Sequence, residues 1–310
     1  MPLVSIIIPV YNVEKYILRC LASIQQQSLK DIEIIIVNDC TPDHSMSVVN
    51  ELAKDDHRIS ILNLERNEGP MIARKKGYMA ATGDYITFCD GDDYLPPTAI
   101  ETLYHAAIES NADIISGNIM YINESGERCP WMNRLKYGNS REGIFKSLLR
   151  HELGHNLCSK MFKAALLQKK EYRTYKNATN GEDGCMLYQI IANMTSIVQI
   201  KDAVYYYVQN AESSSQKKLS KNALENICSA NTVRIASVSK YPELQKDLIV
   251  CVSTVLVDLY YSGYNKNGTL SKLISKYNLN YYCSNMTIIR SYPFVVSCKL
   301  LMKKYMLRKK

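Results

Sequence analysis

The chain has 310 residues, of which 46% are hydrophobic and 22% charged, an ordinary globular composition that can bury a full core. No stretch reaches the roughly 18 consecutive apolar residues that a membrane-spanning helix needs. The net charge is +8, and ten Lys or Arg but no Asp or Glu follow Asp258, so the positive excess belongs to the C-terminal part. Ten cysteines lack zinc-site spacing, and we expect them to be reduced and mostly buried.

The first 120 residues alternate between strand-like and helix-like segments. We expect strands at Val4–Val10, Ile32–Asn38, Ile59–Asn63, Tyr85–Cys89 and Ala112–Ser116, and helices at Val13–Gln27, His44–Lys54, Met71–Ala81 and Thr98–Ser110. This order predicts an α/β fold with a mostly parallel sheet and right-handed crossovers. The start of the chain has no basic segment or cleavage site, so we expect a first strand rather than a signal peptide, in a cytoplasmic protein.

After residue 120 the pattern loosens. Residues 126–141 are expected to form loops over the sheet edge, before helices at Ile144–Leu153, Lys160–Lys169 and Gly184–Met194 and strands at Ser196–Lys201 and Ala203–Gln209. From about Ser220 the chain is helical in character and increasingly basic. We therefore predict an α/β domain over residues 1–215, with halves 1–120 and 121–215, followed by a helical basic extension over residues 216–310.

Three carboxylates, Asp90, Asp92 and Asp93, follow the strand at Tyr85–Cys89 within four positions. Like charges this close repel unless a cation lies among them. Ligands of open α/β sheets bind beyond the carboxyl ends of the strands, and few hard oxygen ligands suit Mg²⁺ or Mn²⁺ shared with substrate phosphates. The alternative is a solvated acidic turn in which Asp93 caps the helix that begins near Pro96.

Four motifs in order decide between these interpretations. They are Val4-Ser5-Ile6-Ile7-Ile8-Pro9-Val10-Tyr11-Asn12, Ile36-Val37-Asn38-Asp39, Asn67-Glu68-Gly69 with Ala73-Arg74, and Asp90 to Asp93. Together they resemble family 2 glycosyltransferases of the GT-A fold over roughly residues 3–215. The resemblance implies a Rossmann-like, mostly parallel sheet flanked by helices, and an inverting, metal-dependent transferase that uses a nucleotide-sugar, expected to be UDP-linked.

The resemblance also assigns residues to the nucleotide. Pro9, Tyr11 and Asn12 leave the first strand where the family holds the nucleotide, and Tyr11 would offer its ring to the base. Without the other motifs, Tyr11 would be expected only to pack the loop. Asp39 matches the position that accepts a hydrogen bond from the base, although the family often has a second acid where this chain has Asn38.

The resemblance assigns the diphosphate and the metal to residues of the next two motifs. The resemblance places the guanidinium of Arg74 near the diphosphate, where its fork can pair two oxygens; a helix-surface arginine is the alternative. It makes Asp92 the principal metal ligand and Asp90 the helper, with Asp90 and Gly91 in the nucleotide-sugar site. Asp93 is the weaker candidate.

A general base is expected in the second half of the domain. Displacement at the anomeric carbon requires one beside the acceptor hydroxyl, and the resemblance assigns it to Asp183, oriented by Glu182. Helix capping is the alternative, because acids are favourable in a first helical turn. Tyr205-Tyr206-Tyr207 and Ser213 to Gln216 resemble the family's closing strand and loop, with a plain edge strand as the alternative, and Leu157 to Phe162 resemble a stretch near the acceptor entrance. His151 and His155 are expected to be structural.

The last residues mix Lys and Arg with Leu, Met and Tyr, which resembles a helix lying on an anionic membrane surface. A solvated or partner-binding helix is the alternative, and no nucleic-acid recognition motif accompanies the charge. The expected acceptor is a saccharide, free or lipid-linked, in cell-surface polysaccharide or glycolipid assembly, and the protein could be peripheral on the inner face of the membrane. A non-catalytic nucleotide-sugar-binding scaffold is the rival function; a nucleotidyltransferase fits less well, because no glycine-rich loop follows the first strand.

Overall fold

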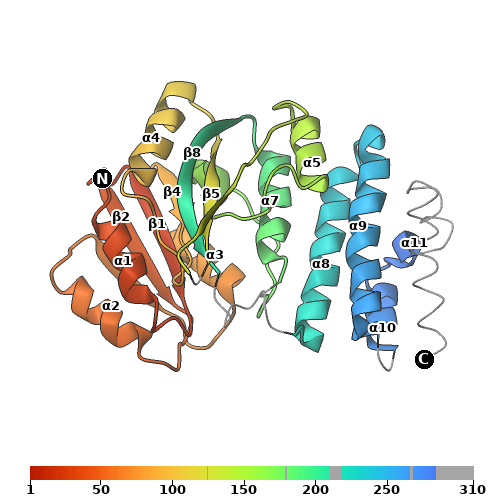
Figure 1. Ribbon diagram of the computed structural model, residues 1–310, viewed down its shortest axis with the longest axis horizontal. Coiled ribbons are helices and arrows are strands. Elements are labelled where there is room, and N and C mark those ends of the chain that lie inside the picture. Colours follow the sequence, from red (N-terminus) through yellow and green to blue (C-terminus); the bar gives the residue numbers. More distant parts are fainter. Residues whose placement is uncertain (124, 179, 210–217, 266–267, 284–310) are drawn as a thin grey trace.

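The computed structural model describes residues 1–123, 125–178, 180–209, 218–265 and 268–283 (Figure 1). One sheet contains the strands β1 (Val4–Val10), β2 (Ile32–Asn38), β3 (Ile59–Asn63), β4 (Tyr85–Phe88), β5 (Ile114–Ile122), β6 (Arg128–Trp131), β7 (Lys160–Lys163) and β8 (Ile197–Val208). Their order is β3-β2-β1-β4-β7-β5-β6, and β8 pairs with β5. The mixed α/β fold with a mostly parallel central sheet is the one that the motifs predict.

The helices are α1 (Ile17–Gln25), α2 (Ser45–Ala53), α3 (Pro70–Ala80), α4 (Ala99–Ser110), α5 (Arg141–Leu149), α6 (Ala164–Gln168), α7 (Glu182–Asn193), α8 (Lys221–Val238), α9 (Gln245–Leu259), α10 (Thr269–Lys276) and α11 (Asn280–Cys283). A 3₁₀ turn at Pro242–Leu244 precedes α9, and a π-helical turn at Tyr260–Tyr264 follows it. α3 packs on β1 and β2, whereas α4 packs on β5, β7 and β8.

The strands β1, β2 and β4 form the centre of the parallel part and are almost entirely buried. Their near-continuous apolar sequences suit strands that are covered on both faces by helices. All three have bounds within one residue of those expected from the sequence. Buried parallel strands of this kind hold the segments that follow them in fixed positions at one sheet edge.

The second half of the domain differs from the expected pattern. Residues 160–169 do not form one helix, because Lys160–Lys163 is the strand β7, inserted antiparallel between β4 and β5, and only Ala164–Gln168 is helical. The expected loop at 126–141 contains the edge strand β6, and the two expected strands after residue 195 are the single strand β8. These pairings join segments far apart in the chain, so local sequence patterns could not indicate them.

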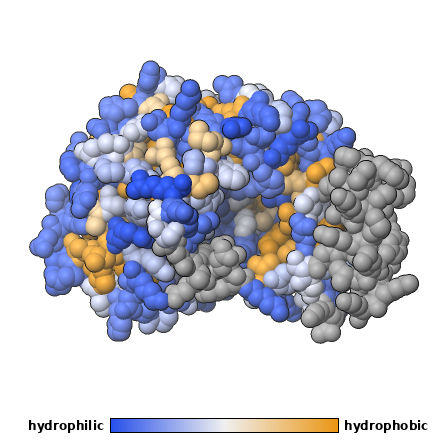
Figure 2. Space-filling model, viewed as in Figure 1, coloured by the Kyte–Doolittle hydropathy of each residue, from blue (hydrophilic) through white to orange (hydrophobic). Residues whose placement is uncertain are grey.

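The helices after residue 217 lie beside the sheet-containing part rather than on it, at the right in Figure 1. α8 packs on α7, α9 packs on α5 and α8, and α10 packs on α8. None of the helices in the described residues is long and apolar enough to cross a membrane. The predicted boundary at residue 215 and the basic residues 299–310 lie outside the described residues. Figure 2 shows a mostly hydrophilic face that is hollowed near its centre.

Candidate active site

The carboxyl ends of parallel strands meet at one edge of the sheet. β1 lies between β2 and β4, and Val10 at its end pairs with Asn38 at the end of β2. The backbone N–H of Asp39 donates to the Val10 carbonyl (3.0 Å). The segment 9–12, Asp39 and the acids 90–93 therefore emerge at the same edge, where ligands of open α/β sheets bind.

The loop after β1 leaves Tyr11 exposed. Tyr11 is 42% exposed, whereas Pro9 is half-buried. Asn12 adopts the left-handed conformation (φ 54°), and its backbone N–H donates to Oγ1 of Thr41 (2.8 Å). The segment after β2 thus fixes the turn that presents Tyr11.

Asp39 positions the turn that leads into α3. It is only 2% exposed, and its two carboxylate oxygens accept the backbone N–H groups of Glu68 (2.7 Å) and Gly69 (2.8 Å). Burial raises the pKa of Asp39, and these two hydrogen bonds oppose the rise. The motif resemblance did not indicate this positioning role, and contact with a nucleotide base stays a prediction.

Gly69 is required where this turn meets another segment. Its φ is 89°, and a Cβ atom at this position would lie 2.8 Å from Cα of Asn177. Pro70 then starts α3 with the fixed φ that suits a first helical residue. The start of α3 is therefore fixed, and Arg74 on its next turn is directed inward.

Arg74 lies at the centre of the acid cluster. The guanidinium is 3% exposed; Nη2 donates to Asp90 Oδ1 (2.6 Å), and Nη1 lies 2.9 Å from Asp183 Oδ1 and 3.9 Å from Glu182 Oε1. Burial alone would lower the pKa of Arg74, but Asp183 and Asp90 hold it well above its ordinary value. Arg74 thus joins acids from both halves of the domain, and its predicted contact with a diphosphate stays a prediction.

The three acids after β4 have different surroundings. Asp90 and Asp92 are half-buried, whereas Asp93 is 1% exposed. The thiol of Cys158 donates to Asp90 Oδ2 (3.4 Å), and Arg19 donates to the backbone carbonyl of Asp92 (2.9 Å). The two acids expected at the metal are thus the two that keep some access to solvent.

Asp93 does not cap the helix that follows. α4 begins after Thr98 without a side-chain cap, and Asp93 instead accepts the hydroxyl of Tyr205 (2.6 Å) and the backbone N–H of Val208 (2.7 Å). Burial raises its pKa well above the ordinary value, helped by the charges of Asp92 and Asp90. The role of Asp93 is therefore to attach β8 to the acid cluster.

Gly91 allows the acid cluster to approach the start of the chain. A Cβ atom on Gly91 would lie 3.0 Å from Cγ2 of Val13 and 3.5 Å from the Pro9 carbonyl oxygen. The turn between Asp90 and Asp92 is therefore packed against the segment that carries Tyr11. Gly91 therefore contacts the segment that carries Tyr11, and its place in the nucleotide-sugar site stays a prediction.

Asp183 and Glu182 occupy the first turn of α7, whose N-cap is Gly181. Asp183 Oδ2 accepts the backbone N–H of Leu157 (3.2 Å), and Asp183 Oδ1 faces Arg74. Both acids lie in the first turn, where the helix dipole favours them, so the role of Asp183 as base stays a prediction. Asp183 and Asp90 thus both lie against the guanidinium of Arg74.

Burial shifts the titration of this acid pair upward. It raises the pKa of Glu182 to about 7, with the charge of Asp183 as the next cause. Burial also raises the pKa of Asp183, while Arg74 opposes the rise. A carboxylate with a raised pKa is a stronger proton acceptor than an ordinary one, and the direction of the shift of Asp183 is therefore the one that suits a general base.

Sequence reasoning missed three side chains around this centre. Cys158 contacts Asp90, Tyr205 accepts the backbone N–H of Asp90 (3.2 Å), and Lys160 is fully buried. Burial lowers the pKa of Lys160 to about 8, and Nζ donates to the carbonyls of Gly154 (3.1 Å) and Asn156 (2.7 Å). Their segments were noted as motif-like, but nothing local in the sequence indicates which side chains reach the acids.

The donor set fits a divalent metal only together with a ligand from the substrate. Within the described part of the chain, no group of three His, Cys, Asp or Glu side chains is arranged to hold a metal. Asp90 and Asp92 offer hard, partly exposed oxygens, although Arg74 and Cys158 already contact Asp90. Such a pair suits Mg²⁺ or Mn²⁺ that is completed by substrate phosphates and water.

The two histidines pack against aromatic rings, as expected of structural residues. The rings of His151 and His155 pack edge to face (5.3 Å between centroids), and His155 also packs against Tyr188 (5.7 Å). The predicted closing loop at Ser213 to Gln216 lies outside the described residues.

The family is shown by comparison with known proteins. Residues 5–175 match the family described as glycosyl transferase family 2, which is more than half of the chain. The chain therefore belongs to glycosyl transferase family 2. This confirms the family that the four motifs predict.

Two relatives and one solved structure extend this finding. Glycosyltransferase GlyA of Streptococcus pneumoniae is 33% identical over 66% of this chain and 30% of its own length, so the match spans about a third of that relative. A GalNAc(5)-diNAcBac-PP-undecaprenol beta-1,3-glucosyltransferase of Campylobacter jejuni is 34% identical over 56% of this chain and 55% of its own length. TarS 1–349 of S. aureus in complex with UDP-GlcNAc has a TM-score of 0.61 at 20% identity, over 90% of this chain and 92% of that one, which confirms the GT-A fold.

Proposed function

We propose that this chain is an inverting, metal-dependent transferase that moves a sugar from a UDP-sugar to a saccharide acceptor. The observation that carries the proposal is the cluster in which Arg74 joins Asp90, beside the predicted metal ligand Asp92, to Asp183. It combines residues for a diphosphate with a carboxylate suited to accept a proton. Family membership and the position of the cluster at the strand ends support it.

In the proposed reaction Asp183 acts as general base. The acceptor hydroxyl gives its proton to Asp183 as its oxygen bonds to the anomeric carbon, the bond from that carbon to the diphosphate oxygen breaks, and the bonding electrons leave with UDP. Attack opposite to the leaving group inverts the configuration. The backbone N–H of Leu157 and the guanidinium of Arg74 would orient Asp183 for this step.

The metal would be held by Asp92, with Asp90 as helper, and completed by donor phosphate oxygens. When bound, it would supply positive charge to the leaving diphosphate. Arg74 donates to Asp90, so its guanidinium would add a second positive charge near the leaving diphosphate. Tyr11, with its exposed ring, would stack on the base, next to Pro9, Asn12 and Asp39.

The acceptor is proposed to belong to cell-surface polysaccharide or glycolipid assembly. The Campylobacter relative is named for an undecaprenol-linked saccharide, and the structural neighbour holds UDP-GlcNAc. A membrane contact of the basic residues 299–310, on the inner face of the cell membrane, is part of the proposal on sequence grounds alone.

Calorimetric titration of the full chain with UDP, with Mn²⁺ and again with chelator, tests the proposal. UDP should bind in the presence of metal, and Asp92→Ala should lose the metal dependence. Asp183→Asn is the matched control, because it neutralises a carboxylate on the acceptor side and should keep metal-dependent UDP binding. The absence of UDP binding under either condition would favour a scaffold without donor binding. In a separate assay of sugar transfer, intact activity of Asp92→Ala would show that the metal assignment is wrong.

A further inference from the structure

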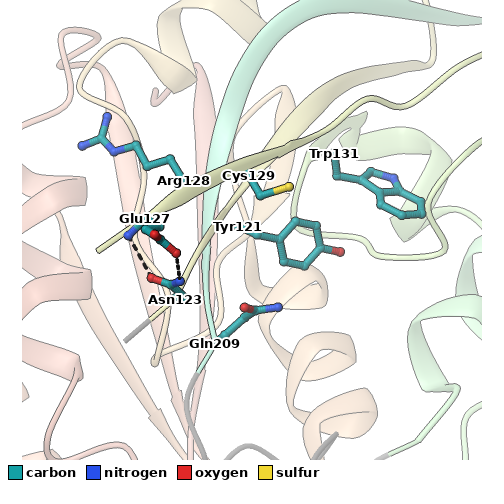
Figure 3. Close-up of a pocket in the computed structure, with 7 residues that line it drawn as sticks. All are labelled: Tyr121, Asn123, Glu127, Arg128, Cys129, Trp131 and Gln209. Carbon is teal, nitrogen blue, oxygen red and sulfur yellow. Dashed lines mark hydrogen bonds between the residues drawn. The ribbon is translucent and has the colours of Figure 1, made fainter. Parts of the chain in front are cut away.

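A pocket separate from the acid cluster lies at the sheet edge formed by β5, β6 and the end of β8 (Figure 3). Its volume is about 730 Å³, within the range of roughly 300–1,000 Å³ that is typical of small-ligand pockets. The lining residues are Tyr121, Asn123, Glu127, Arg128, Cys129, Trp131 and Gln209. None of them belongs to the acid cluster.

Strand register places the aromatic residues of this site on one face of the sheet. Tyr121 pairs with Cys129 on β6 and with Tyr207 on β8, and partners across a strand pair share a face. Trp131, two residues after Cys129, therefore lies on that face as well. Figure 3 shows the Tyr121, Cys129 and Trp131 side chains projecting to the same side, while Arg128 extends to the other.

The same face carries the link to the acid cluster. Tyr205 lies two residues before Tyr207 on β8, and its hydroxyl contacts both Asp93 and the backbone N–H of Asp90. Tyr205 contacts the acid cluster at one end of this face, and Tyr121 lines the pocket. Tyr207 lies between them on the same face.

A second connection runs through the loop that follows α5. A Cβ atom on Gly154 would lie 3.7 Å from the indole Nε1 of Trp131, so Trp131 lies next to this loop. Three residues later the loop supplies the N–H of Leu157 that binds Asp183. The pocket thus adjoins the acceptor side of the active site, not the donor side around Tyr11.

The chemistry of the lining suits a sugar ring. Trp131 is 39% exposed, and Tyr121 packs edge to face against Trp131 (6.3 Å between centroids). An indole face can cover the apolar C–H face of a pyranose, while amide groups bond its hydroxyls. Gln209 supplies an amide, and Asn123, hydrogen-bonded to Glu127 (2.7 Å), supplies another polar group at the rim.

We propose that this pocket is an acceptor subsite that binds a pyranose ring of the acceptor saccharide, one or more residues away from the sugar that receives the new bond. The inference rests on the proposed transfer to a saccharide. It adds to that function a site that would select acceptors by their length and ring type.

Trp131 is the single tryptophan of the chain, so its fluorescence reports on this pocket alone. The full chain is titrated with maltotriose, cellotriose and chitotriose, each without nucleotide. A saturable change in emission with at least one trisaccharide is expected, and the change should persist in Asp183→Asn. No saturable change with any of the three overturns the proposal, as does a change caused by UDP alone or by phosphatidylglycerol vesicles alone.

Thiol labelling gives a second measurement that does not need the indole. Cys129 in the pocket and Cys40 near the strand ends are both exposed. The bound trisaccharide should slow alkylation of Cys129 by iodoacetamide and leave that of Cys40 unchanged. Trp131→Ala should raise the trisaccharide concentration for half-protection about tenfold, the equivalent of one lost stacking contact. Trp131→Phe should recover most of the loss.

Met132→Ala is the matched control, because Met132 is adjacent, 46% exposed and not part of the lining. It should leave protection of Cys129 unchanged, and an equal loss in Met132→Ala and Trp131→Ala would overturn the subsite. UDP binding is measured on the same samples to separate the two proposals. Saccharide binding without UDP binding would contradict the proposed function but retain the subsite, whereas UDP binding without saccharide binding would do the reverse.

Discussion

The two halves of the sheet-containing part contribute unlike parts of one site. Residues 1–120 form consecutive parallel units and supply Asp39, Arg74 and the acids 90–93. Residues 121–215 contribute the antiparallel strands β6 and β7, the helix α7 with Asp183, and the closing strand β8.

Contacts between the halves converge on the short segment after β4. Arg74 binds Asp90 and faces Asp183, Cys158 binds Asp90, and Tyr205 binds Asp93. The candidate site therefore lies at a seam, by which we mean the contacts of Arg74, Cys158 and Tyr205 with Asp90, Asp93 and Asp183. Its geometry depends on pairing charges from both halves. We expect variants of the first half to alter donor binding and variants of the second half to alter transfer.

Among variants of the second half, Asp183→Asn should lower the rate of sugar transfer most, and it should leave UDP affinity unchanged. Loss of a general base typically lowers turnover by about 10²–10⁴-fold, because the acceptor hydroxyl then has no positioned proton acceptor. UDP release from a UDP-sugar in the presence of acceptor measures the rate, and calorimetry measures UDP affinity. A variant that retains transfer within a few-fold would show that another group is the base.

Arg74→Gln should damage both halves at once. Removing the cation leaves the half-buried acids Asp90 and Asp183 without their buried partner, and breaking a buried ion pair typically costs about 3–5 kcal/mol of the free energy of unfolding. The loss should shrink as the pH falls, because burial raises the pKa of Asp183 and this carboxylate then becomes protonated. Urea unfolding at pH 5 and pH 8 measures both effects.

Lys76→Gln, which removes an exposed cation from the same helix, is the control for Arg74→Gln. It should change the free energy of unfolding by no more than about 0.5 kcal/mol. Equal losses in the two variants would mean that Arg74 does not hold the seam together.

The sequence could predict the first half because its elements are local. Each strand and its following helix are read from consecutive residues, and Asp39 and Asp90 come directly after strands whose ends must meet. The assignment of Asp183 needed the resemblance, since no local pattern brings α7 toward Arg74 on α3. The same resemblance could not reveal that Asp39 holds the turn at Gly69.

The second half was harder because its pairings are non-local. Lys160 begins a strand between β4 and β5, yet its apolar neighbours and the following Ala164–Gln168 helix resemble one continuous helix in the sequence. The sequence pattern around Trp131 predicts a loop. Only its pairing with Ile119 places Trp131 on the sheet face that carries Tyr205 and Tyr121. Burial of Lys160 and Asp93 likewise depends on the assembled fold.

Tyr205→Phe should loosen the contacts of β8 with Asp93 and with the backbone of Asp90. The variant keeps the ring but removes the hydroxyl that donates to Asp93 and accepts from the Asp90 N–H. A buried acceptor that loses its donor typically costs about 1–3 kcal/mol, measurable by urea unfolding. Tyr206→Phe is the control, because it keeps the ring contact with Tyr94, and should change stability by less than about 0.5 kcal/mol.

Glu182→Gln should have the smallest effect, visible as a change in pH dependence. Burial and the charge of Asp183 raise the pKa of Glu182 to about 7, above the ordinary 4.5, so between these values the folded protein binds more protons than the unfolded chain. Stability therefore falls as the pH rises through this window, by at most about 1.4 kcal/mol per pH unit for one group.

Urea midpoints at half-unit steps from pH 4.5 to pH 8 measure this slope. Glu182→Gln should flatten it, since the amide does not titrate, whereas Glu142→Gln in the exposed first turn of α5 should leave it unchanged. A slope that persists in Glu182→Gln would mean that the protons are taken up elsewhere, and the acid pair at the start of α7 would then not be poised for proton transfer near neutral pH.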